Sequence, residues 1–414
     1  MGTGRFDAVV VGAGPAGSAT ALALARGGAR VALVDKASFP RDKACGDVVG
    51  PRGVAALEAL GLGAALTGVH VGDMVVVGPT GGRARLPCFP GLDYPGHGVA
   101  VPRLRLDAAL LGAARQAGAA LVTGRVAGLL PRGGVALDDG RGLGAEVVVG
   151  ADGATSTVAG AAGLVDPGRV LWGFALRVYV ETPATLPHIV LWAPDGRRAF
   201  PGYGWLFPGP DGRANAGLGI GTLADRRAGA GAARLLPAFL GHLGALGLLE
   251  GRPAAAGRLG GWLKMGMVGT TVASGRVLLV GDAAGLVNPL QGEGIAHAVT
   301  SGLRAAGAVL AGVDGAAARY RRAIAGEHLA YHRVAAALHA GLVGRPRVAA
   351  LAGRVLTSAP VGRAVGGGWS IFWNELLDGA APGPACTVAG AAAAVAGVLT
   401  RRSPTGRWLA AALT

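Results

Sequence analysis

The chain is poor in cysteine and in charged side chains for its 414 residues. Its cysteines, Cys45, Cys88 and Cys386, are odd in number and far apart, which argues against a disulfide framework and for a reducing compartment. Only 15% of the residues are charged and 51% are hydrophobic, so a disordered chain is excluded. The eight histidines show no spacing typical of metal ligands and no signature of a nucleophile triad is visible, so we predict neither kind of site.

Targeting and membrane segments are also lacking. No basic region followed by an apolar core stands before the first expected strand, so we expect no signal peptide and a cytoplasmic protein. Residues 379–400 form the one long uncharged stretch, but it contains two prolines. We expect a packed C-terminal helix there, with attachment to a membrane surface as the alternative.

The charge that is present is mostly positive, since 39 Lys and Arg against 24 Asp and Glu give a net charge of +15. Such a balance favours an anionic partner. The basic residues are scattered arginines without recognition motifs for nucleic acid. We therefore expect an anionic membrane surface or a phosphorylated ligand, and no nucleic acid.

Residues 6–35 predict a β-α-β unit. The apolar run 8–11 is typical of a buried parallel strand, residues 16–25 of a helix, and residues 31–34 of a second strand that ends at Asp35. Such a unit is the usual setting of a dinucleotide site.

Three glycines in this unit form the pattern G-x-G-x-x-G. Gly12 would allow the tight turn, Gly14 the close approach of a pyrophosphate to the backbone, and Gly17 the close packing of helix on strand. Asp35 is placed to accept hydrogen bonds from a ribose diol. The unit predicts a dinucleotide site, and FAD and NAD fit it equally well.

The remaining chain alternates between helical and strand-like segments. We expect helices at 53–60, 103–117, 232–246 and 294–310, strands at 119–122, 146–149, 172–180, 189–192, 204–207, 214–220 and 275–280, further short strands between 69 and 101, and helices beyond 315. Residues 36–51 read as a loop, and no internal repeat is visible.

A second motif lies at the end of the strand expected at 275–280. The Asp282 carboxylate, which follows Gly281, can bind a ribityl hydroxyl, and the helix that opens at 292–294 can stabilise negative charge on a reduced isoalloxazine. A helix cap formed by Asp282 would explain the acid but neither Pro289 nor the glycines after it. This motif favours FAD over NAD.

These motifs carry a family resemblance. Residues 12–17, the Gly150-Ala151-Asp152-Gly153 segment with Ser156, and Gly281-Asp282 resemble the three flavin motifs of the FAD-dependent group that includes para-hydroxybenzoate hydroxylase. Arg103 and Asp107 resemble the helix of that group that touches the flavin.

Within that group the sequence is most similar to the geranylgeranyl reductase family. The resemblance is carried by the loop PRDKACGD at 40–47, by YGWLFP at 203–208 with NAGLG at 215–219, by NPLQGEG at 288–294, and by Gly285, where the hydroxylases usually have His. Ala159, where the second motif usually ends in Arg, departs from the pattern and weakens a nicotinamide-docking role there. Gln291, where Thr or Asn is commoner, is a milder departure.

The resemblance implies an α/β fold in which a Rossmann-like FAD-binding domain is interleaved with a β-sheet substrate domain. A chain of this length also suggests two domains. We predict an FAD-binding domain from residues 1–68, 102–170 and 269–312, a substrate domain from 69–101 and 171–268, and a C-terminal helical region at 313–414.

The resemblance also implies a set of site residues. For FAD these are Gly12, Gly14, Pro15, Ala16, Gly17, Asp35, Lys36, Arg41, Ala44, Arg103, Val126, Asp152, Gly281, Asp282, Gly292, Gly294 and Ile295. Cys45 and Gly46 are the catalytic candidates, and Tyr203, Trp205, Phe207 and Pro289 are the candidates for substrate binding.

From the residues alone, Cys45 has two interpretations. The neighbouring Lys43 could lower the pKa of the thiol, which would then donate a proton or orient the substrate, whereas an inert thiol in a packed loop is the alternative. Cys88 and Cys386 are interpreted as structural.

Aromatic residues near the expected substrate site also leave alternatives open. Tyr203, Trp205 and Phe207 alternate along a strand, so they would share one face and form either an aromatic wall or part of a sheet core. Trp369, Phe372 and Trp373 have helical spacing, which favours ordinary packing.

The resulting hypothesis is an FAD-dependent reductase that saturates C=C bonds of an isoprenoid, such as a geranylgeranyl lipid or a menaquinone side chain. Reduced flavin would deliver hydride, Cys45 or a water that it positions would protonate the other carbon, and NADPH or ferredoxin would supply electrons. The alternatives are a flavin monooxygenase or epoxidase, a halogenase-like enzyme, and a non-catalytic prenyl-lipid carrier. The positive charge and an apolar pocket would suit peripheral contact with a membrane.

Overall fold

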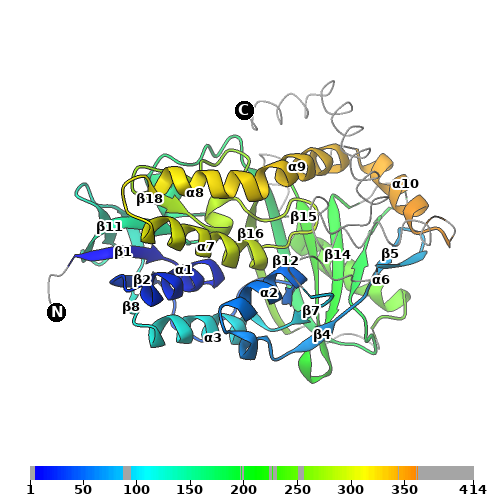
Figure 1. The fold of residues 1–414 in the computed structure, drawn as a ribbon. Helices are drawn as coiled ribbons and strands as arrows, with labels where there is room; N and C mark the ends of the chain where they lie inside the picture. The colour runs from blue at the N-terminus through cyan, green and yellow to red at the C-terminus, as the bar shows by residue number, and fades with distance from the viewer. Residues whose placement is uncertain are drawn as a thin grey trace.

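In the computed structural model, the described residues are 5–361 except for 87–94, 196, 198–199, 223–225, 227–230, 250–255, 344 and 360. They form a mixed α/β structure with two large sheets and one small one. Figure 1 shows the first sheet and α1 on the left, the second sheet on the right, α8 and α9 along the top, and α7 beneath α8. The α/β fold expected from the sequence is confirmed.

The first sheet has a parallel centre, with strand order β17-β18-β11-β1-β2-β8. Val10 on β1 pairs with Leu33 on one side and Val149 on the other, as the predicted β-α-β unit requires. The strands are β1 (Phe6–Val11), β2 (Val31–Asp35), β8 (Ala120–Thr123), β11 (Gly142–Gly150), β17 (Ala273–Ser274) and β18 (Val277–Leu279). Residues 8–11 of β1, 31–34 of β2 and 147–149 of β11 are apolar and buried, and polar residues such as Asp7 and Asp35 stand near the strand ends.

Three helices pack on this sheet and bury its apolar strands: α1 (Pro15–Arg26), α3 (Arg103–Gln116) and α7 (Ile295–Leu310). The hairpin of β9 (Val126–Leu129) and β10 (Gly134–Leu137), which extends β11, was not predicted. Both of its strands are four residues long and contain glycine, so they carry little periodic signal.

The second sheet has the order β16-β12-β15-β14-β13-β5-β6. Its strands are β5 (Met74–Val77), β6 (Arg83–Leu86), β12 (Leu171–Glu181), β13 (His188–Val190), β14 (Gly202–Pro208), β15 (Arg213–Gly221) and β16 (Ala256–Met265). The sequence predicts all of these except β16. That strand contains three glycines and shows no clear alternation of apolar and polar residues.

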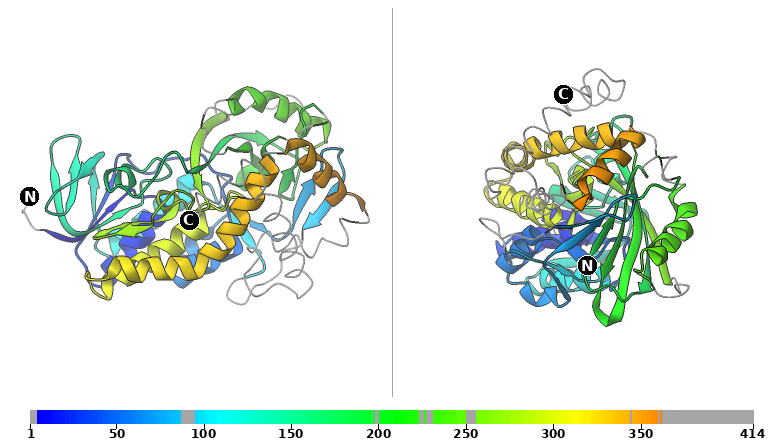
Figure 2. Two further views of the ribbon diagram at one scale, coloured as in Figure 1. Left: turned by 90° about the horizontal axis from the view of Figure 1, so that it is seen from above. Right: turned by 90° about the vertical axis from the view of Figure 1, so that its right-hand side faces the viewer.

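The two faces of the second sheet have different partners. On one face, Leu206 and Leu218 pack against Phe239 of α6 (Ala232–Ala245) in an apolar core. In Figure 2, α6 (green) lies on the outer side of the sheet. On the opposite face, Tyr203, Trp205 and Phe207 line a cavity. Period-two alternation along β14 thus separates core residues from site residues.

A third, small sheet and several short elements connect the two large sheets. The small sheet is β3 (Val48–Val49), β7 (Gly98–Ala100) and β4 (Val69–Val71). The short elements are α2 (Pro51–Ala59), α4 (Thr157–Ala161) and the 3-10 turns η1 (Gly63–Leu66), η2 (Pro210–Gly212) and η3 (Gly281–Ala284). The predicted division into domains remains a prediction.

The last described part of the chain is helical, as expected. Helix α8 (Ala316–Ile324) continues through a π-helical turn, η4 (Ala325–Leu329), into α9 (Ala330–Val343), and α10 (Pro346–Leu356) follows. Among the described residues, no helix is both long and apolar enough to cross a membrane. The sequence-based interpretations of Cys88, Trp369, Phe372, Trp373, Cys386 and residues 379–400 lie outside the described residues.

Candidate active site

Two adjoining cavities lie where the first and second sheets meet. The nucleotide cavity, of about 490 Å³, is bordered by Gly12, Asp35 and Asp152. The reaction cavity, of about 200 Å³, is bordered by Cys45 and Trp205. The two cavities share the lining residues Pro15, Lys43, Ala44, Asp282 and Ala298. A long ligand could therefore occupy both.

Backbone shape at the nucleotide cavity requires glycine at two positions. Gly12 has φ +101°, and a Cβ there would stand 2.4 Å from the Ala151 carbonyl oxygen. A Cβ on Gly17 would stand 1.7 Å from the Gly12 carbonyl oxygen. The tight turn and the close helix-strand packing predicted from the sequence are both present.

Two acids border the nucleotide cavity in different ways. Asp35 accepts hydrogen bonds from the amides of Ala13 (2.7 Å) and Ala37 (2.8 Å), which fix the carboxylate at the strand end where a ribose would bind. Asp152 accepts from the Ser156 hydroxyl (2.5 Å) and the Thr157 amide (2.7 Å). Asp152 therefore also organises the start of α4, in addition to its predicted role toward FAD.

A buried ion cluster joins the predicted loop to α3. Asp107 is fully buried and accepts two hydrogen bonds from Arg103, at 2.7 and 2.8 Å. Arg41 lies 3.2 Å from the same carboxylate. A charge-assisted cluster of this kind holds the Arg103 side chain in one direction, toward the thiol of Cys45.

At the junction of the cavities, Asp282 is paired with Lys43 at 3.7 Å. Gly281 lines neither cavity; its amide donates to the Ser301 hydroxyl (3.0 Å). Gly294 and Ile295, at the start of α7, border the reaction cavity. The positive end of a helix dipole therefore faces this cavity, as the sequence predicts for a flavin site.

The environment of Cys45 differs from the sequence-based expectation. Burial raises the pKa of the thiol, and the positive charge of Arg103 opposes this shift only in part. Lys43, which was expected to lower the pKa, is paired with Asp282 instead. The expectation was wrong because adjacency in the chain does not decide which cation faces the sulfur. The thiol therefore stays protonated at neutral pH, the form that can donate a proton.

A buried carboxylate that the sequence did not single out as a site residue lies beside Cys45. Asp47 is 4% exposed and has φ +64°. It accepts hydrogen bonds from the Tyr179 hydroxyl (2.7 Å), the Asn215 amide group (2.8 Å) and the Arg103 amide (3.2 Å), while its own amide donates to the Cys45 sulfur (3.4 Å). Burial raises the pKa of Asp47, and the hydrogen bonds from Tyr179 and Asn215 oppose the shift.

Asn215 and Arg177 extend this network into the second sheet. The Asn215 side chain donates to the Cys45 carbonyl (2.7 Å) and accepts from the Trp205 indole (2.9 Å). Arg177 is fully buried, pairs with Asp42 and stacks over the Tyr179 ring at 4.3 Å. In the sequence, only the period-two spacing of Arg177 and Tyr179 along β12 could have indicated that the two side chains lie on one face.

The aromatic residues of β14 form one wall of the reaction cavity. The rings of Tyr203 and Trp205 are 6.2 Å apart, and those of Trp205 and Phe207 are 6.3 Å apart. All three line the cavity and so share one face, as predicted, while Trp205 is also buried and Phe207 packs against the core residues Met74 and Leu86. Their role in substrate binding stays a prediction. A Cβ on Gly46 would stand 2.9 Å from the Phe207 ring, which explains a glycine next to Cys45.

Two further titratable residues lie near the cavities. His339 borders the reaction cavity, and burial lowers its pKa to about 4, so the imidazole is neutral. Lys264 is 1% exposed, and burial lowers its pKa to about 8 although Asp152 and Asp282 oppose the shift. Neither stood out in the sequence, because a single His or Lys in an apolar segment carries no motif.

The structure brings the predicted site residues together with two exceptions. Gly17 and Gly281 line neither cavity and serve packing instead. The others border the nucleotide cavity (Gly12, Gly14, Pro15, Ala16, Asp35, Lys36, Arg41, Ala44, Val126, Asp152, Asp282) or the reaction cavity (Arg103, Gly292, Gly294, Ile295, Pro289, Cys45, Gly46, Tyr203, Trp205, Phe207). This arrangement fits FAD, because helix N-termini, a ribose-binding acid and a junction acid follow one another along two joined cavities.

Comparisons with known proteins support an FAD site. A family model described as an FAD binding domain matches residues 5–184. The chain is 39% identical over 314 residues to menaquinone reductase of Mycolicibacterium smegmatis, which covers 73% of this chain and 76% of the relative. It is 33% identical to digeranylgeranylglycerophospholipid reductase 2 of Methanopyrus kandleri, covering 74% and 77% of the two chains.

Solved structures show the same fold. A geranylgeranyl bacteriochlorophyll reductase-like protein from Thermoplasma acidophilum superposes with a TM-score of 0.71 at 21% identity, covering 87% of this chain and 96% of that protein. A flavin-dependent halogenase also superposes, with a TM-score of 0.65 at 21% identity, covering 89% and 70%. At these identities the structures establish the fold and leave the reaction open.

The chain is thus an FAD-dependent oxidoreductase, and it belongs to the geranylgeranyl reductase family together with these reductases. The predicted cofactor FAD and the predicted reductase class are confirmed at this level. The relatives named as reductases favour isoprenoid reduction over the monooxygenase and halogenase alternatives.

Proposed function

We propose that this protein saturates a C=C bond in the isoprenoid side chain of a quinone or a prenyl lipid. The observation that carries the proposal is that the Cys45 thiol and the aromatic wall of β14 border the largely apolar reaction cavity. This cavity adjoins the nucleotide cavity at Lys43 and Asp282. An isoprenoid chain matches such a cavity in shape and polarity. Reduced FAD, when bound, supplies the hydride.

The protein groups would supply the proton and the orientation. Cys45 stays protonated because burial raises its pKa, so it can protonate the second alkene carbon. Asp47 and Asn215 fix the loop that carries this thiol. Trp205 and Phe207 would hold the alkene against the cofactor and exclude water, which matters because an isolated alkene accepts hydride poorly.

For the source of electrons we propose NADPH or a ferredoxin. Ala159, which stands where the family motif usually has Arg, is buried and offers no charge to a nicotinamide dinucleotide phosphate. Anaerobic mixing of the oxidised holoenzyme with each donor separates them, because the correct donor bleaches the flavin absorbance within the turnover time.

We further propose that α10 contacts a membrane surface. Val348, Leu351 and Val355 are 53%, 61% and 47% exposed on one side of this helix, which also carries Arg347 and Arg354. An apolar face flanked by arginine is typical of helices that lie in an anionic lipid interface. Gly353 on the same helix faces Pro79 and Leu191, next to the strands that contribute Met74, Leu86 and Ile189 to the reaction cavity.

The reaction is tested in a single turnover without oxygen. Dithionite-reduced holoenzyme is mixed with menaquinone or a geranylgeranyl lipid in detergent, and the product is analysed by mass spectrometry. We expect a gain of about two mass units per reduced bond together with reoxidation of the flavin. Oxygenated product formed only in air would favour the monooxygenase alternative, and bound but unchanged lipid would favour a carrier.

Membrane contact is tested separately by sedimentation with vesicles of phosphatidylglycerol and phosphatidylcholine. We expect Leu351→Glu to reduce binding to anionic vesicles by about tenfold, since it removes apolar burial and adds repulsion. Leu104→Glu is the matched control, because Leu104 is an exposed leucine of α3 (43%) far along the chain from α10. Equal loss in both variants would contradict a specific role of α10.

A further inference from the structure

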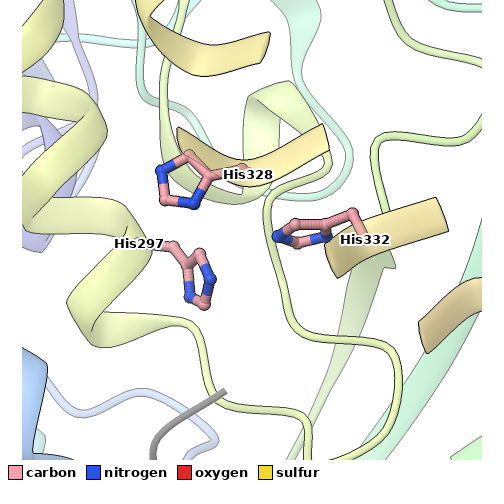
Figure 3. Close-up of side chains that lie close together, drawn as sticks. All are labelled: His297, His328 and His332. Atoms are coloured by element: carbon pink, nitrogen blue, oxygen red, sulfur yellow. The ribbon is translucent and has the colours of Figure 1, made fainter. Parts of the chain in front are cut away.

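Three buried histidines from different segments converge behind the reaction cavity. His297 lies on α7, His328 in the π-helical turn η4, and His332 on α9. Each of the three is at most 2% exposed. Figure 3 shows their rings turned toward one another. A π-helical turn within a helix is rare and is frequent at functional sites.

The geometry of this trio approaches that of a metal centre. One ring nitrogen from each histidine can be chosen so that the three atoms lie within 4.8 Å of one another. Around a tetrahedral zinc ion, with Zn–N about 2.1 Å, ligand nitrogens are about 3.4 Å apart, so each ring nitrogen has to move toward the centre by about 0.8 Å or less. The rings meet at interplanar angles of 48°, 82° and 87°, with centroids 5.1, 5.2 and 5.9 Å apart, so they contact one another tilted or edge-on and not in a parallel stack.

A carboxylate already orients one of the rings. Nδ1 of His297 is 3.1 Å from Oε2 of Glu293, four residues earlier, and the other oxygen of Glu293 accepts a hydrogen bond from the Ala296 amide (2.8 Å). This contact engages Nδ1 of His297, so Nε2 is the nitrogen of this ring that would bind an ion. Carboxylate–histidine pairs of this kind fix ring direction and raise ligand basicity at metal sites.

The charges around the trio suit a divalent cation held by neutral ligands. Glu293 supplies one nearby negative charge, and Glu327 supplies a second at 3.9 Å from Nε2 of His328. Arg52 and Arg304 bind the Glu327 carboxylate, so Glu293 is the acid left to balance an ion. Three neutral imidazoles and one second-sphere carboxylate favour zinc or a similar first-row metal over Ca²⁺ or Mg²⁺, which prefer oxygen.

We propose that His297, His328 and His332 form a binding site for a divalent transition metal, Zn²⁺ in the first place. The ion would fasten α9 and the π-helical turn to α7. Glu293 also lines the reaction cavity, so the same ion would stiffen the cavity wall at 292–295. The role is structural, and it is independent of the substrate and of the proposed reaction.

Part of this site was visible in the sequence. His328 and His332 are four residues apart, which places them on one side of a helix, but the expectation of no metal-ligand spacing passed over this pair. The third ligand, His297, is 31 positions earlier than His328. Only packing of α7 against the later helices brings it close.

Metal content of the tag-free holoenzyme tests the site directly. The protein is stripped with a chelator, reloaded with Zn²⁺ alone, desalted and analysed by mass spectrometry for zinc. We expect about one equivalent in the wild type and less than about 0.2 in His332→Gln, which keeps the side-chain volume but weakens the ligand set. His70→Ala is the control, because exposed His70 stacks on His97 at 4.2 Å and is the alternative place for loosely held zinc.

Cobalt substitution separates a real site from a folding defect. Co²⁺ bound by three imidazoles in a four-coordinate site gives intense visible bands, which we expect in the wild type and in His70→Ala but not in His328→Ala. FAD content of every variant shows whether it is folded. A wild type that retains less than about 0.2 equivalent of zinc after reloading, or a folded His332→Gln that binds as much as the wild type, would overturn the proposal.

Discussion

The nucleotide end and the reaction end of this site are built from different kinds of groups. At the nucleotide end, the lining is mostly backbone and small side chains, and the acid Asp35 is fixed by two main-chain amides. At the reaction end, charged and polar side chains are buried together: Asp47, Arg103 and Asp107 are all less than 5% exposed. The nucleotide end depends on the shape of its backbone together with partly exposed acids such as Asp35 and Asp152, whereas the reaction end is an apolar cavity supported by buried charge pairs.

The difference determines how each end fails. A cavity formed by backbone is lost when an added side chain enters it, because a Cβ cannot stand only about 2 Å from a non-bonded backbone atom. A buried polar network is lost when one partner is removed, because the remaining groups stay desolvated and unpaired. Substitutions at the two ends should therefore separate cofactor binding from turnover.

The largest effect is expected at the nucleotide end. In Gly17→Ala the new Cβ would stand 1.7 Å from the Gly12 carbonyl oxygen, so strand and helix must separate. We expect FAD content, measured from the flavin absorbance per protein, to fall by at least about tenfold. In the control Gly112→Ala, a Cβ meets nothing within 4 Å in the helix α3, and FAD content should be unchanged. Equal flavin content in the two variants would contradict a backbone-defined cavity.

The next largest effect is expected from Asp47→Asn at the reaction end. The carboxylate accepts from the Arg103 amide, Tyr179 and Asn215, and an amide group would turn a donor toward these donors. We expect FAD to remain bound while the rate of flavin reoxidation by substrate falls by roughly 100-fold.

Asp139→Asn serves as the control for Asp47→Asn, since Asp139 pairs with Arg141 on the surface. It should leave the rate unchanged. If Asp47→Asn lost FAD in proportion to activity, the two ends would not be separable and the comparison between them would break down.

Replacement of Cys45 tests the proton donor within the reaction end. For Cys45→Ala we expect a rate of alkene reduction lower by roughly 10- to 100-fold, with flavin reduction by dithionite unaffected. Because burial raises the thiol pKa above its ordinary value of 9.0, the wild-type rate should stay level from pH 7 to 9 and fall only above that range. Unchanged reduction in Cys45→Ala would exclude the donor role.

The smallest effect is expected at Lys264, between the two ends. Its pKa is about 8 in the folded protein and 10.5 when exposed, so between these values the unfolded chain binds the proton that the folded chain does not. Folding stability should therefore rise with pH through this window and be lost as pH falls toward 8. The free energy of unfolding of the wild type should be higher at pH 9.5 than at pH 7 by on the order of 2 kcal/mol from this lysine, and chemical denaturation should show that Lys264→Met lacks this difference. The same difference in both proteins would contradict the burial of a titrating lysine.

The nucleotide end was predictable because its determinants are local. Gly12, Gly17 and Asp35 lie within one β-α-β unit, where spacing in the sequence and distance in space are tied by the lengths of one strand and one helix. The aromatic face of β14 was predictable for the same reason, since a strand alternates its side chains.

The reaction end shows what the sequence did not determine. Cys45, Arg103 and Asn215 are far apart in the chain, and they become partners only because α3 and the second sheet both pack against the 40–47 loop. For that reason the cation that faces the thiol is Arg103 and not the adjacent Lys43. His297 joins His328 and His332 in the same way. The sequence by itself determined the cofactor and the family through its motifs and their resemblance to known reductases, and the strand faces through local periodicity. The tertiary structure alone decided which buried charges and imidazoles meet, because those contacts depend on how distant elements pack.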